Sequence, residues 1–212
     1  MSSINHHPTF NYSQPDSYRF SHDSVFLARK VFELLRSEIK TEWQALDLCA
    51  GCGIVGMDFL FHCRKELQLV PRGFDFLEVQ DDYKSHFDIN KDRLESLDTK
   101  IQYLSQNYVE PIPTQYDLIL CNPPYFNPSE GLLSPNRFKN RCRFFIDASH
   151  AELIATIESA LRHKGRAYVL TRNAKPPTTA KLNAQVVGDI RGTTLICYER
   201  IIGDTAPSIQ GG

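Results

Sequence analysis

Short apolar runs alternate with amphipathic stretches along most of the chain. The apolar runs predict buried strands at residues 44–48, 72–77, 101–105, 116–121 and 165–171. Apolar residues at helical spacing predict a helix that begins near residue 23 and further helices at 54–65, 80–95 and 149–162. Strands that alternate with helices in this way are typical of a parallel sheet with helices on both faces.

The remaining segments break this rhythm. Residues 185–191 and 193–201 flank Gly192 and predict a terminal β-hairpin, so the last strand is expected to run antiparallel. Residues 126–148 contain no predicted element and are too long for a plain connection, so we expect them to cover a substrate. We expect one domain at 17–205, a flexible segment at 1–16 and a flexible tail at 206–212.

Composition changes this picture little. The chain has 212 residues, of which 42% are hydrophobic and 23% charged, ordinary values for a single globular domain. The formal net charge of −1 gives no global signal for nucleic acid, which leaves only a local patch. Arg137, Lys139, Arg141 and Arg143 form such a patch, and it is either a solvated face or a set of contacts to RNA phosphates.

Other function classes are disfavoured by what the sequence lacks. No apolar run is long enough to span a bilayer and no leader opens the chain, so we expect a cytoplasmic protein without membrane contacts. The six cysteines are therefore expected to be free thiols. Cys49 and Cys52 have the spacing of half a zinc site, but no second Cys/His pair answers them, and no metal site is predicted.

The sequence Asn122-Pro123-Pro124-Tyr125 directly follows the predicted strand 116–121. Proline fixes φ and holds the preceding residue extended, so this corner has few conformations. The Asn122 side chain and the Pro123 carbonyl then form a stiff pair of acceptors beside an aromatic face. That arrangement fits a planar group bearing an NH2, which could be adenine, guanine, cytosine or a carboxamide. A plain turn after a strand is the alternative interpretation.

A glycine turn follows the first predicted strand. Gly51, Gly53 and Gly56 come after Asp47, and glycines let a backbone approach a ligand closely. The spacing also fits a dinucleotide fingerprint. A carboxylate at the mouth of the turn, however, opposes a pyrophosphate and favours a ligand with an ammonium group, such as S-adenosylmethionine. Glu78 ends the second strand, where it either binds ribose hydroxyls or is a solvated strand end.

Together and in this order, these pieces resemble the class I S-adenosylmethionine-dependent methyltransferases that modify amino groups. The resemblance is strongest to the bacterial tRNA(Val) adenine-N6 methyltransferase family. It covers about residues 16–172 and rests on Tyr18 to Ser24, Asp47 to Gly53, Glu78-Val79-Gln80, Asn90, Asn122 to Phe126, and Arg141 to Arg143. The chain departs from the family pattern at Cys49, which replaces the first glycine of the turn, and at Gln106-Asn107, which replace an acid.

The resemblance implies a Rossmann-like class I methyltransferase fold at residues 17–205. Its sheet would have seven mostly parallel strands with an antiparallel last strand and helices on both faces. The implied activity is methyl transfer from S-adenosylmethionine to N6 of adenine in RNA, with tRNA as the favoured substrate and no metal.

The resemblance also implies roles for individual residues. The cofactor would be bound by Phe20, Asp23, Asp47, Gly51, Gly53, Glu78, Val79, Asn107 and Asn122. Catalysis would fall to Asn122, Pro123, Pro124 and Tyr125, and RNA binding to Tyr125, Phe126, Arg137, Lys139, Arg141 and Arg143. Asp23 is alternatively a simple helix cap.

Several alternatives stay open at this point. The release-factor glutamine methyltransferases share the Asn-Pro-Pro-Tyr corner, although they carry an N-terminal helical domain that has no counterpart before the first predicted helix. A protein glutamine amide, a base in DNA or ribosomal RNA, or a small amine would offer the same NH2. A non-catalytic adenosyl-binding or RNA-scaffolding protein is a third class, which the intact corner opposes. The oligomeric state and the need for a partner subunit are not determined by the sequence.

Overall fold

The computed structural model describes residues 11–16, 19, 22–94, 98–112, 114–173 and 177–201. Within them a seven-stranded sheet has the strand order β3-β2-β1-β4-β5-β7-β6. The strands are β1 (Gln44–Leu48), β2 (Gly73–Glu78), β3 (Lys100–Ser105), β4 (Tyr116–Cys121), β5 (Leu161–Thr171), β6 (Leu182–Ile190) and β7 (Thr193–Arg200). Strand β7 is antiparallel to both neighbours and the other pairs are parallel, which confirms the expected fold class.

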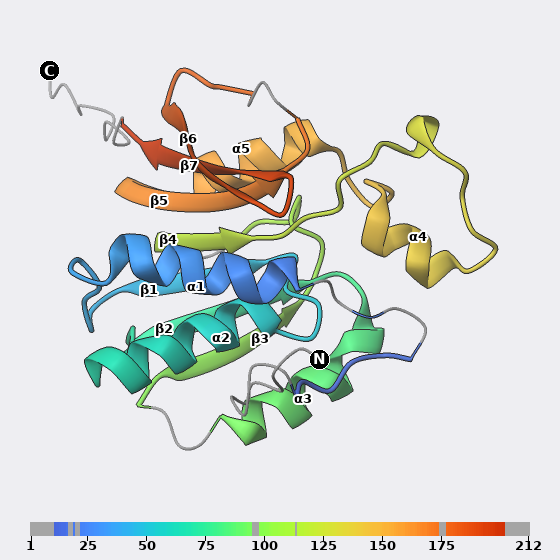
Figure 1. Cartoon of the computed structure of the whole chain (residues 1–212). Coiled ribbons are helices and arrows are strands. Elements are labelled where there is room, and N and C mark those ends of the chain that lie inside the picture. The colour runs from blue at the N-terminus through green and yellow to red at the C-terminus, as the bar shows by residue number, and fades with distance from the viewer. Residues whose placement is uncertain are drawn as a thin grey trace, which may run out of the picture.

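Helices cover both faces of this sheet (Figure 1). The helices on the two faces are α1 (Asp23–Leu35), α2 (Ile54–His62), α3 (Lys84–Arg93) and α5 (His150–Ala160), and a further helix, α4 (Arg137–Arg143), lies apart from them. A π-helical turn (Cys63–Leu67) continues α2, and 3-10 turns lie at Asp81–Tyr83 and Pro128–Glu130. Two separate hydrophobic clusters result, one for each face.

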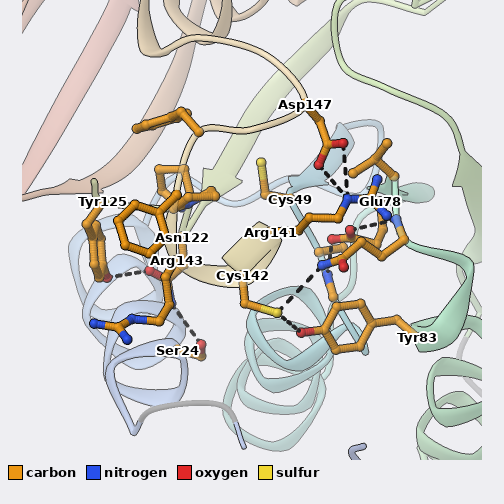
Figure 2. A pocket seen from close by; sticks show the side chains of 18 of the residues that line it. Ser24, Cys49, Glu78, Tyr83, Asn122, Tyr125, Arg141, Cys142, Arg143 and Asp147 are labelled. Atoms are coloured by element: carbon orange, nitrogen blue, oxygen red, sulfur yellow. Dashed lines mark hydrogen bonds and ion pairs between the residues drawn. The ribbon is translucent and has the colours of Figure 1, made fainter. Parts of the chain in front are cut away.

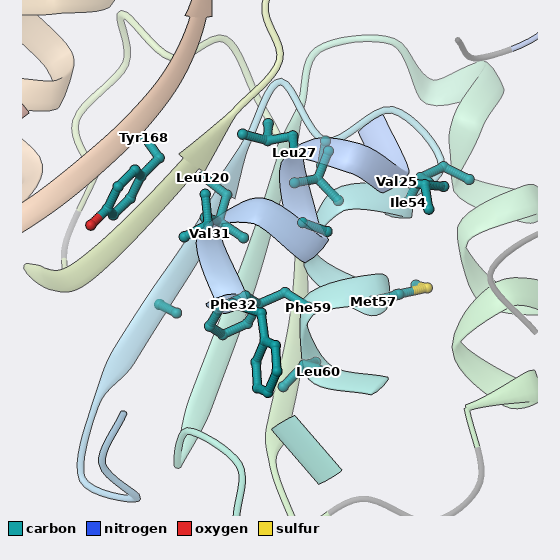
Figure 3. Close-up of a cluster of buried hydrophobic side chains, with 14 of the residues drawn as sticks. Val25, Leu27, Val31, Phe32, Ile54, Met57, Phe59, Leu60, Leu120 and Tyr168 are labelled. Carbon is teal, nitrogen blue, oxygen red and sulfur yellow. The ribbon is translucent and has the colours of Figure 1, made fainter. Parts of the chain in front are cut away.

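Helices α1 and α2 lie side by side over the first face, where their apolar side chains form the larger cluster (Figure 3). The rings of Phe32 and Phe59 meet edge to face with 6.4 Å between centroids. Gly56 lets α2 approach the sheet, because a Cβ there would lie 2.5 Å from the Phe76 ring and 2.7 Å from that of Phe74. Close helix–strand packing therefore explains the third glycine of the turn.

Helix α5 covers the second face. Its N-terminus is a capping box in which Ser149 accepts from the backbone of Glu152 and the Glu152 carboxylate accepts from Ser149. We expected the helix to reach residue 162 and the next strand to begin at 165. Instead β5 begins directly after Ala160, and a left-handed Lys164 (φ 63°) creates an irregularity in its pairing with β4. Glycine at 165 therefore lies inside the strand rather than before it.

The segment 126–148 leaves the carboxyl end of β4 and returns to it. Phe126 pairs with Phe144 in an isolated bridge, which closes the segment at its base. Between them α4 lies beyond the ends of the strands, away from the two helical layers (Figure 1). Hydrophobic periodicity does not predict α4, because only Phe138 and Cys142 of its seven residues are apolar.

Residues 11–16 pack against the domain. Tyr12 is buried, and the backbone of Ser13 both donates to and accepts from the side chain of Asn90 (2.6 and 2.9 Å). Asn90 also donates to the carbonyl of Cys52 (3.0 Å), so one side chain joins this segment, α3 and the glycine turn. Residues 1–10 and the expected tail at 206–212 lie outside the described residues. In the described part of the chain, no helix has both the length and the hydropathy to cross a bilayer.

Candidate active site

A cavity of about 360 Å3 opens at the carboxyl ends of β1, β2 and β4. Parallel strands bring their carboxyl ends to one edge, which is where ligands bind in open α/β sheets. The cavity is lined by residues from distant parts of the sequence, including Ser24, Glu78, Asn122 and Arg141 (Figure 2). Its volume is in the usual range for small-molecule sites.

Glu78 is buried at the end of β2 and faces this cavity. One carboxylate oxygen accepts the N–H of Gly51 (2.8 Å) and the other accepts that of Gln80 (2.9 Å). Burial raises the pKa of Glu78, and the backbone donors partly oppose that rise. Since a carboxylate has about four acceptor positions, both oxygens can still accept from hydroxyl groups of a ligand.

Asp47 is fully buried below the glycine turn and does not line the cavity. Its Oδ2 accepts the N–H of Gly56 (2.8 Å), while Oδ1 has no hydrogen-bond partner among the described residues. Burial raises the pKa of Asp47 to about 8. We expected this carboxylate at the amino acid end of the ligand, but in the structure it holds the first turn of α2.

The turn between β1 and α2 contains three residues with positive φ. These are Cys49 (62°), Gly51 (54°) and Gly53 (82°). Cys49 thus adopts a left-handed conformation at the position where the resemblance led us to expect glycine. Gly51 lines the cavity, whereas Gly53 does not and instead begins α2. A Cβ at Gly53 would lie 2.8 Å from Met57 and from Phe87, so packing requires glycine there.

The side chain of Asn122 is held at both ends (Figure 2). Its Nδ2 donates to the hydroxyl of Ser24 in the first turn of α1 (2.9 Å), and its Oδ1 accepts the hydroxyl of Tyr125 (2.5 Å). These two bonds fix the orientation of the amide, with the oxygen on the side of Tyr125. Pro123 and Pro124 also line the cavity.

The segment 126–148 forms another wall of the cavity. The thiol of Cys142 in α4 contacts the Tyr83 hydroxyl (3.1 Å) and accepts from the Gln80 side chain (3.6 Å), which docks α4 on the loop after β2. Arg141 donates from Nε to both oxygens of Asp147 (3.0 and 2.8 Å). Residues from this segment therefore lie beside the loop that follows β2.

The structure separates the four members of the expected basic patch. Arg141 lines the cavity but is paired with Asp147. Arg143 also lines the cavity, and its exposed guanidinium lies over the rings of Phe126 and Phe144. Arg137 and Lys139 are exposed on α4 and do not line the cavity.

The other predicted site residues differ in whether they line the cavity. Asp23, Val79 and Phe126 line the cavity. Asn107 does not, since its side-chain amide donates to the carbonyl of Asp147 (2.9 Å) and its oxygen accepts from the next turn. Phe20 lies outside the described residues.

Two residues that we did not single out contribute to the site. Ser24 ends the stretch from Tyr18 that carries part of the resemblance, but a serine early in a helix gives no signal that it will orient an asparagine 98 residues away. Arg172 lines the cavity directly after the end of β5. The rule that drew attention to Asn122, a polar residue at the carboxyl end of a buried strand, would also have found Arg172.

The residues present fit S-adenosylmethionine. The volume suits a small nucleoside, Gly51 allows close backbone approach, and Glu78 offers buried acceptors for ribose hydroxyls. Among the described residues, no group of three or more His, Cys, Asp or Glu side chains could hold a metal ion.

Structural comparison supports the same fold. A protein of Escherichia coli proposed to be a methyltransferase, yhhF, superposes with a TM-score of 0.61 at 18% identity, over 90% of this chain and 92% of that one. An rRNA methylase from Streptococcus thermophilus gives 0.53 at 10% identity over 82% and 95%. TrmN from Thermus thermophilus gives 0.55 at 16% identity over 84% of this chain and 49% of TrmN. No curated protein sequence matches the chain.

The family assignment comes from the sequence. The family model of the methyltransferase small domain matches residues 17–191, which is most of the chain and includes every strand up to β6. The strand order, the glycine turn and the cavity at the strand ends agree with that match. The chain belongs to the methyltransferase small domain family and is an S-adenosylmethionine-dependent methyltransferase.

Proposed function

We propose that this enzyme transfers the methyl group to the exocyclic N6 amine of adenine in RNA, with tRNA as the favoured substrate. The observation that carries the proposal is the fixed side-chain amide of Asn122. Its oxygen lies in the cavity wall next to two prolines, and Ser24 and Tyr125 hold it in place. Such a preorganised acceptor suits an NH2 group on a planar ring.

The chain's own groups act on the amine. An exocyclic amine is a weak nucleophile because its lone pair is delocalised into the ring. When the Asn122 oxygen and the Pro123 carbonyl accept its two N–H bonds, the lone pair is directed away from the ring. Positive charge develops on nitrogen in the transition state, so these dipoles stabilise the transition state more than the ground state. The cofactor would supply the methyl group from its sulfonium, which would leave as a neutral thioether, and the methylated nitrogen would then lose a proton to water.

Tyr125 has two tasks in this proposal. Its hydroxyl donates to one lone pair of the Asn122 oxygen, which leaves the other lone pair for the substrate amine. Its ring and that of Phe126, with centroids 6.5 Å apart, provide aromatic faces on which a base turned out of its stack can rest. Stacking of this kind contributes about 1–3 kcal/mol per base.

RNA is favoured over a protein amide by the surroundings of the corner. Arg143 and Arg172 are exposed beside it, and aromatic rings adjoin both. Similar solved structures include an rRNA methylase and TrmN. Asp23, Glu78, Val79 and Gly51 would hold the cofactor, while Asp47 and Gly53 would support it through the turn.

The test uses labelled S-adenosylmethionine with total RNA and, separately, with total protein. We expect label in RNA and, after digestion to nucleosides, in N6-methyladenosine. Asn122→Ala is the control that should abolish this label while still binding the cofactor. Label in protein glutamine, in DNA or in another nucleoside would contradict the proposal, and so would absence of label in every fraction.

A further inference from the structure

A second cavity lies on the other side of the Asn-Pro-Pro-Tyr corner. Its volume is about 370 Å3, and it shares Pro123, Pro124, Tyr125, Phe126 and Arg172 with the first cavity. Its own lining includes Asn127, His150 and Asn173, which offer polar groups, and Thr171 at the end of β5. The corner that faces the reactive amine is therefore a wall common to two cavities.

Arg172 occupies the boundary between these cavities. Its guanidinium carbon lies 5.5 Å from the ring centroid of Tyr125 and 5.2 Å from that of Phe126. The side chain is exposed, and no carboxylate in the described part of the chain pairs with it. The aromatic faces thus position a guanidinium whose N–H donors remain available.

Arg143, at the end of α4, has a similar arrangement. Its guanidinium carbon lies 6.0 Å from the Phe126 centroid and 5.6 Å from that of Phe144. It too is exposed and has no ion pair among the described residues. Arg141, two positions earlier, differs because Asp147 neutralises it. Phe126 therefore has two unneutralised guanidinium groups within 6 Å of its ring.

We propose that Arg172 and Arg143 hold the phosphates on either side of the flipped nucleotide, and that the second cavity receives the neighbouring nucleotide. This inference rests on the proposed function, because it requires a single-stranded nucleic acid as substrate. Cationic side chains combined with aromatic faces are the usual means of holding single strands. A guanidinium stacked on a ring also matches the geometry of a phosphate better than a free lysine does.

Among the described residues that line the second cavity, Glu130 is the one carboxylate, and its position agrees with this placement. Glu130 accepts from the N–H and the side-chain amide of Asn127, both at 2.9 Å, and these bonds lower the pKa of Glu130. It is therefore a fixed negative charge on the wall formed by Asn127. A phosphate would be repelled from that wall and attracted to Arg172, which leaves the Asn127 side of the cavity for the base.

The test compares Arg172→Gln with Arg72→Gln. Arg72 is also exposed but precedes β2, at the edge of the sheet opposite the cavities. Binding of a short single-stranded RNA with one adenine is measured by fluorescence anisotropy over a range of salt concentrations, with the cofactor present. For Arg172→Gln we expect about tenfold weaker binding and a slope of log K against log salt reduced by about 1. Arg72→Gln should match the wild type.

Further variants separate this proposal from simpler explanations. Arg143→Gln should act like Arg172→Gln, whereas Arg172→Lys should keep the salt slope of the wild type and lose part of the affinity. Calorimetry should give unchanged cofactor affinity in all of them, because the site of Glu78 is intact. If Arg172→Gln and Arg72→Gln bind the RNA with the same affinity and the same salt slope, the proposed phosphate contacts are wrong while RNA methylation stands. If the wild type neither binds nor methylates RNA, both proposals fail.

Discussion

The two cavities meet at one corner but are built differently. Around the first cavity, which we propose holds the cofactor, buried acidic side chains are held by backbone N–H groups: Glu78 by Gly51 and Gln80, and Asp47 by Gly56. Around the second cavity, which we propose holds part of the substrate, exposed side chains are positioned by rings, as Arg172 is by Tyr125 and Phe126. One half therefore depends on main-chain geometry and the other on surface side chains.

This difference explains which part of the protein a short motif can encode. Backbone donors at a turn require glycines and a nearby acid at fixed spacing, and a pattern of that kind is visible in one sequence. Exposed arginines that stack on rings need only the right position in space, which many sequences can provide. The cofactor half should therefore tolerate few substitutions, whereas the substrate half can change its specificity without harm to the fold.

The largest expected effect lies at the boundary between the halves. Asn122→Ala should reduce methyl transfer by at least ~10²-fold, because it removes the preorganised acceptor that acts in the transition state. Cofactor affinity measured by calorimetry should change by only a few fold. Equal losses of cofactor affinity and of turnover would show that Asn122 acts mainly in cofactor binding, which would contradict the division between the two cavities.

The next effect tests the cofactor half itself. Glu78→Ala removes a buried acceptor from the N–H groups of Gly51 and Gln80, and we expect cofactor binding to weaken about 10- to 100-fold. Isothermal titration calorimetry measures this change. Glu33→Ala, at an exposed position on α1, is the matched control and should bind like the wild type. If Glu78→Ala bound the cofactor with wild-type affinity, Glu78 would not bind the ribose as proposed above.

A third prediction concerns the pH dependence of stability. The folded protein keeps Asp47 protonated up to about pH 8, whereas the unfolded carboxyl loses its proton near pH 4. Between these values the unfolded state binds fewer protons, so this contribution to stability is complete below pH 4 and falls as the pH rises to 8. Asp47→Asn should therefore lose about 3–4 kcal/mol less stability than the wild type between pH 5 and pH 8.

Urea unfolding at the two pH values checks this prediction. The raised pKa values of Asp75 and Glu78 act in the same direction, but they are present in both proteins and cancel in the difference. Parallel stability curves for wild type and Asp47→Asn would show that Asp47 is ionised in the folded protein.

The smallest expected effect concerns Ser24, which orients Asn122 at the boundary between the two cavities. Ser24→Ala removes the acceptor that fixes the Asn122 amide but touches neither carboxylate of the cofactor half. We expect kcat to fall about fivefold, equivalent to about 1 kcal/mol for one hydrogen bond, with cofactor affinity unchanged. Ser24→Thr retains the hydroxyl and should recover most of the activity. Initial rates at saturating cofactor measure kcat for both variants. An unaltered kcat in Ser24→Ala would show that the bond to Tyr125 is enough to orient the Asn122 amide.

Much of the fold could be predicted from the sequence, because hydrophobic periodicity determines the elements. Strands β1 and β4 occupy the predicted residues, and the antiparallel β7 was expected. The start of β5 was missed because Gly165 looked like a boundary, although it lies inside an irregular strand. Helix α4 was missed because its apolar stripe consists of only two residues, Phe138 and Cys142, which pack against Tyr83.

The candidate site was predicted less evenly. Local patterns identified Glu78 and the corner at Asn122, which line one cavity. Asn107 was expected at the cofactor but donates to a backbone carbonyl of a segment that is distant in sequence. The basic patch was treated as a unit, although pairing with Asp147 separates Arg141 from Arg143. These outcomes depend on tertiary neighbours, which periodicity does not describe.

The bond between Ser24 and Asn122 has a consequence for heat sensitivity. Ser24 lies in the first turn of α1, and the first turn of a helix opens more easily than the core. When that turn opens, the amide is free to rotate while the sheet and both helical layers remain intact. On warming, the enzyme should therefore lose its methyltransferase activity at a temperature at which its circular dichroism spectrum is still that of the native protein.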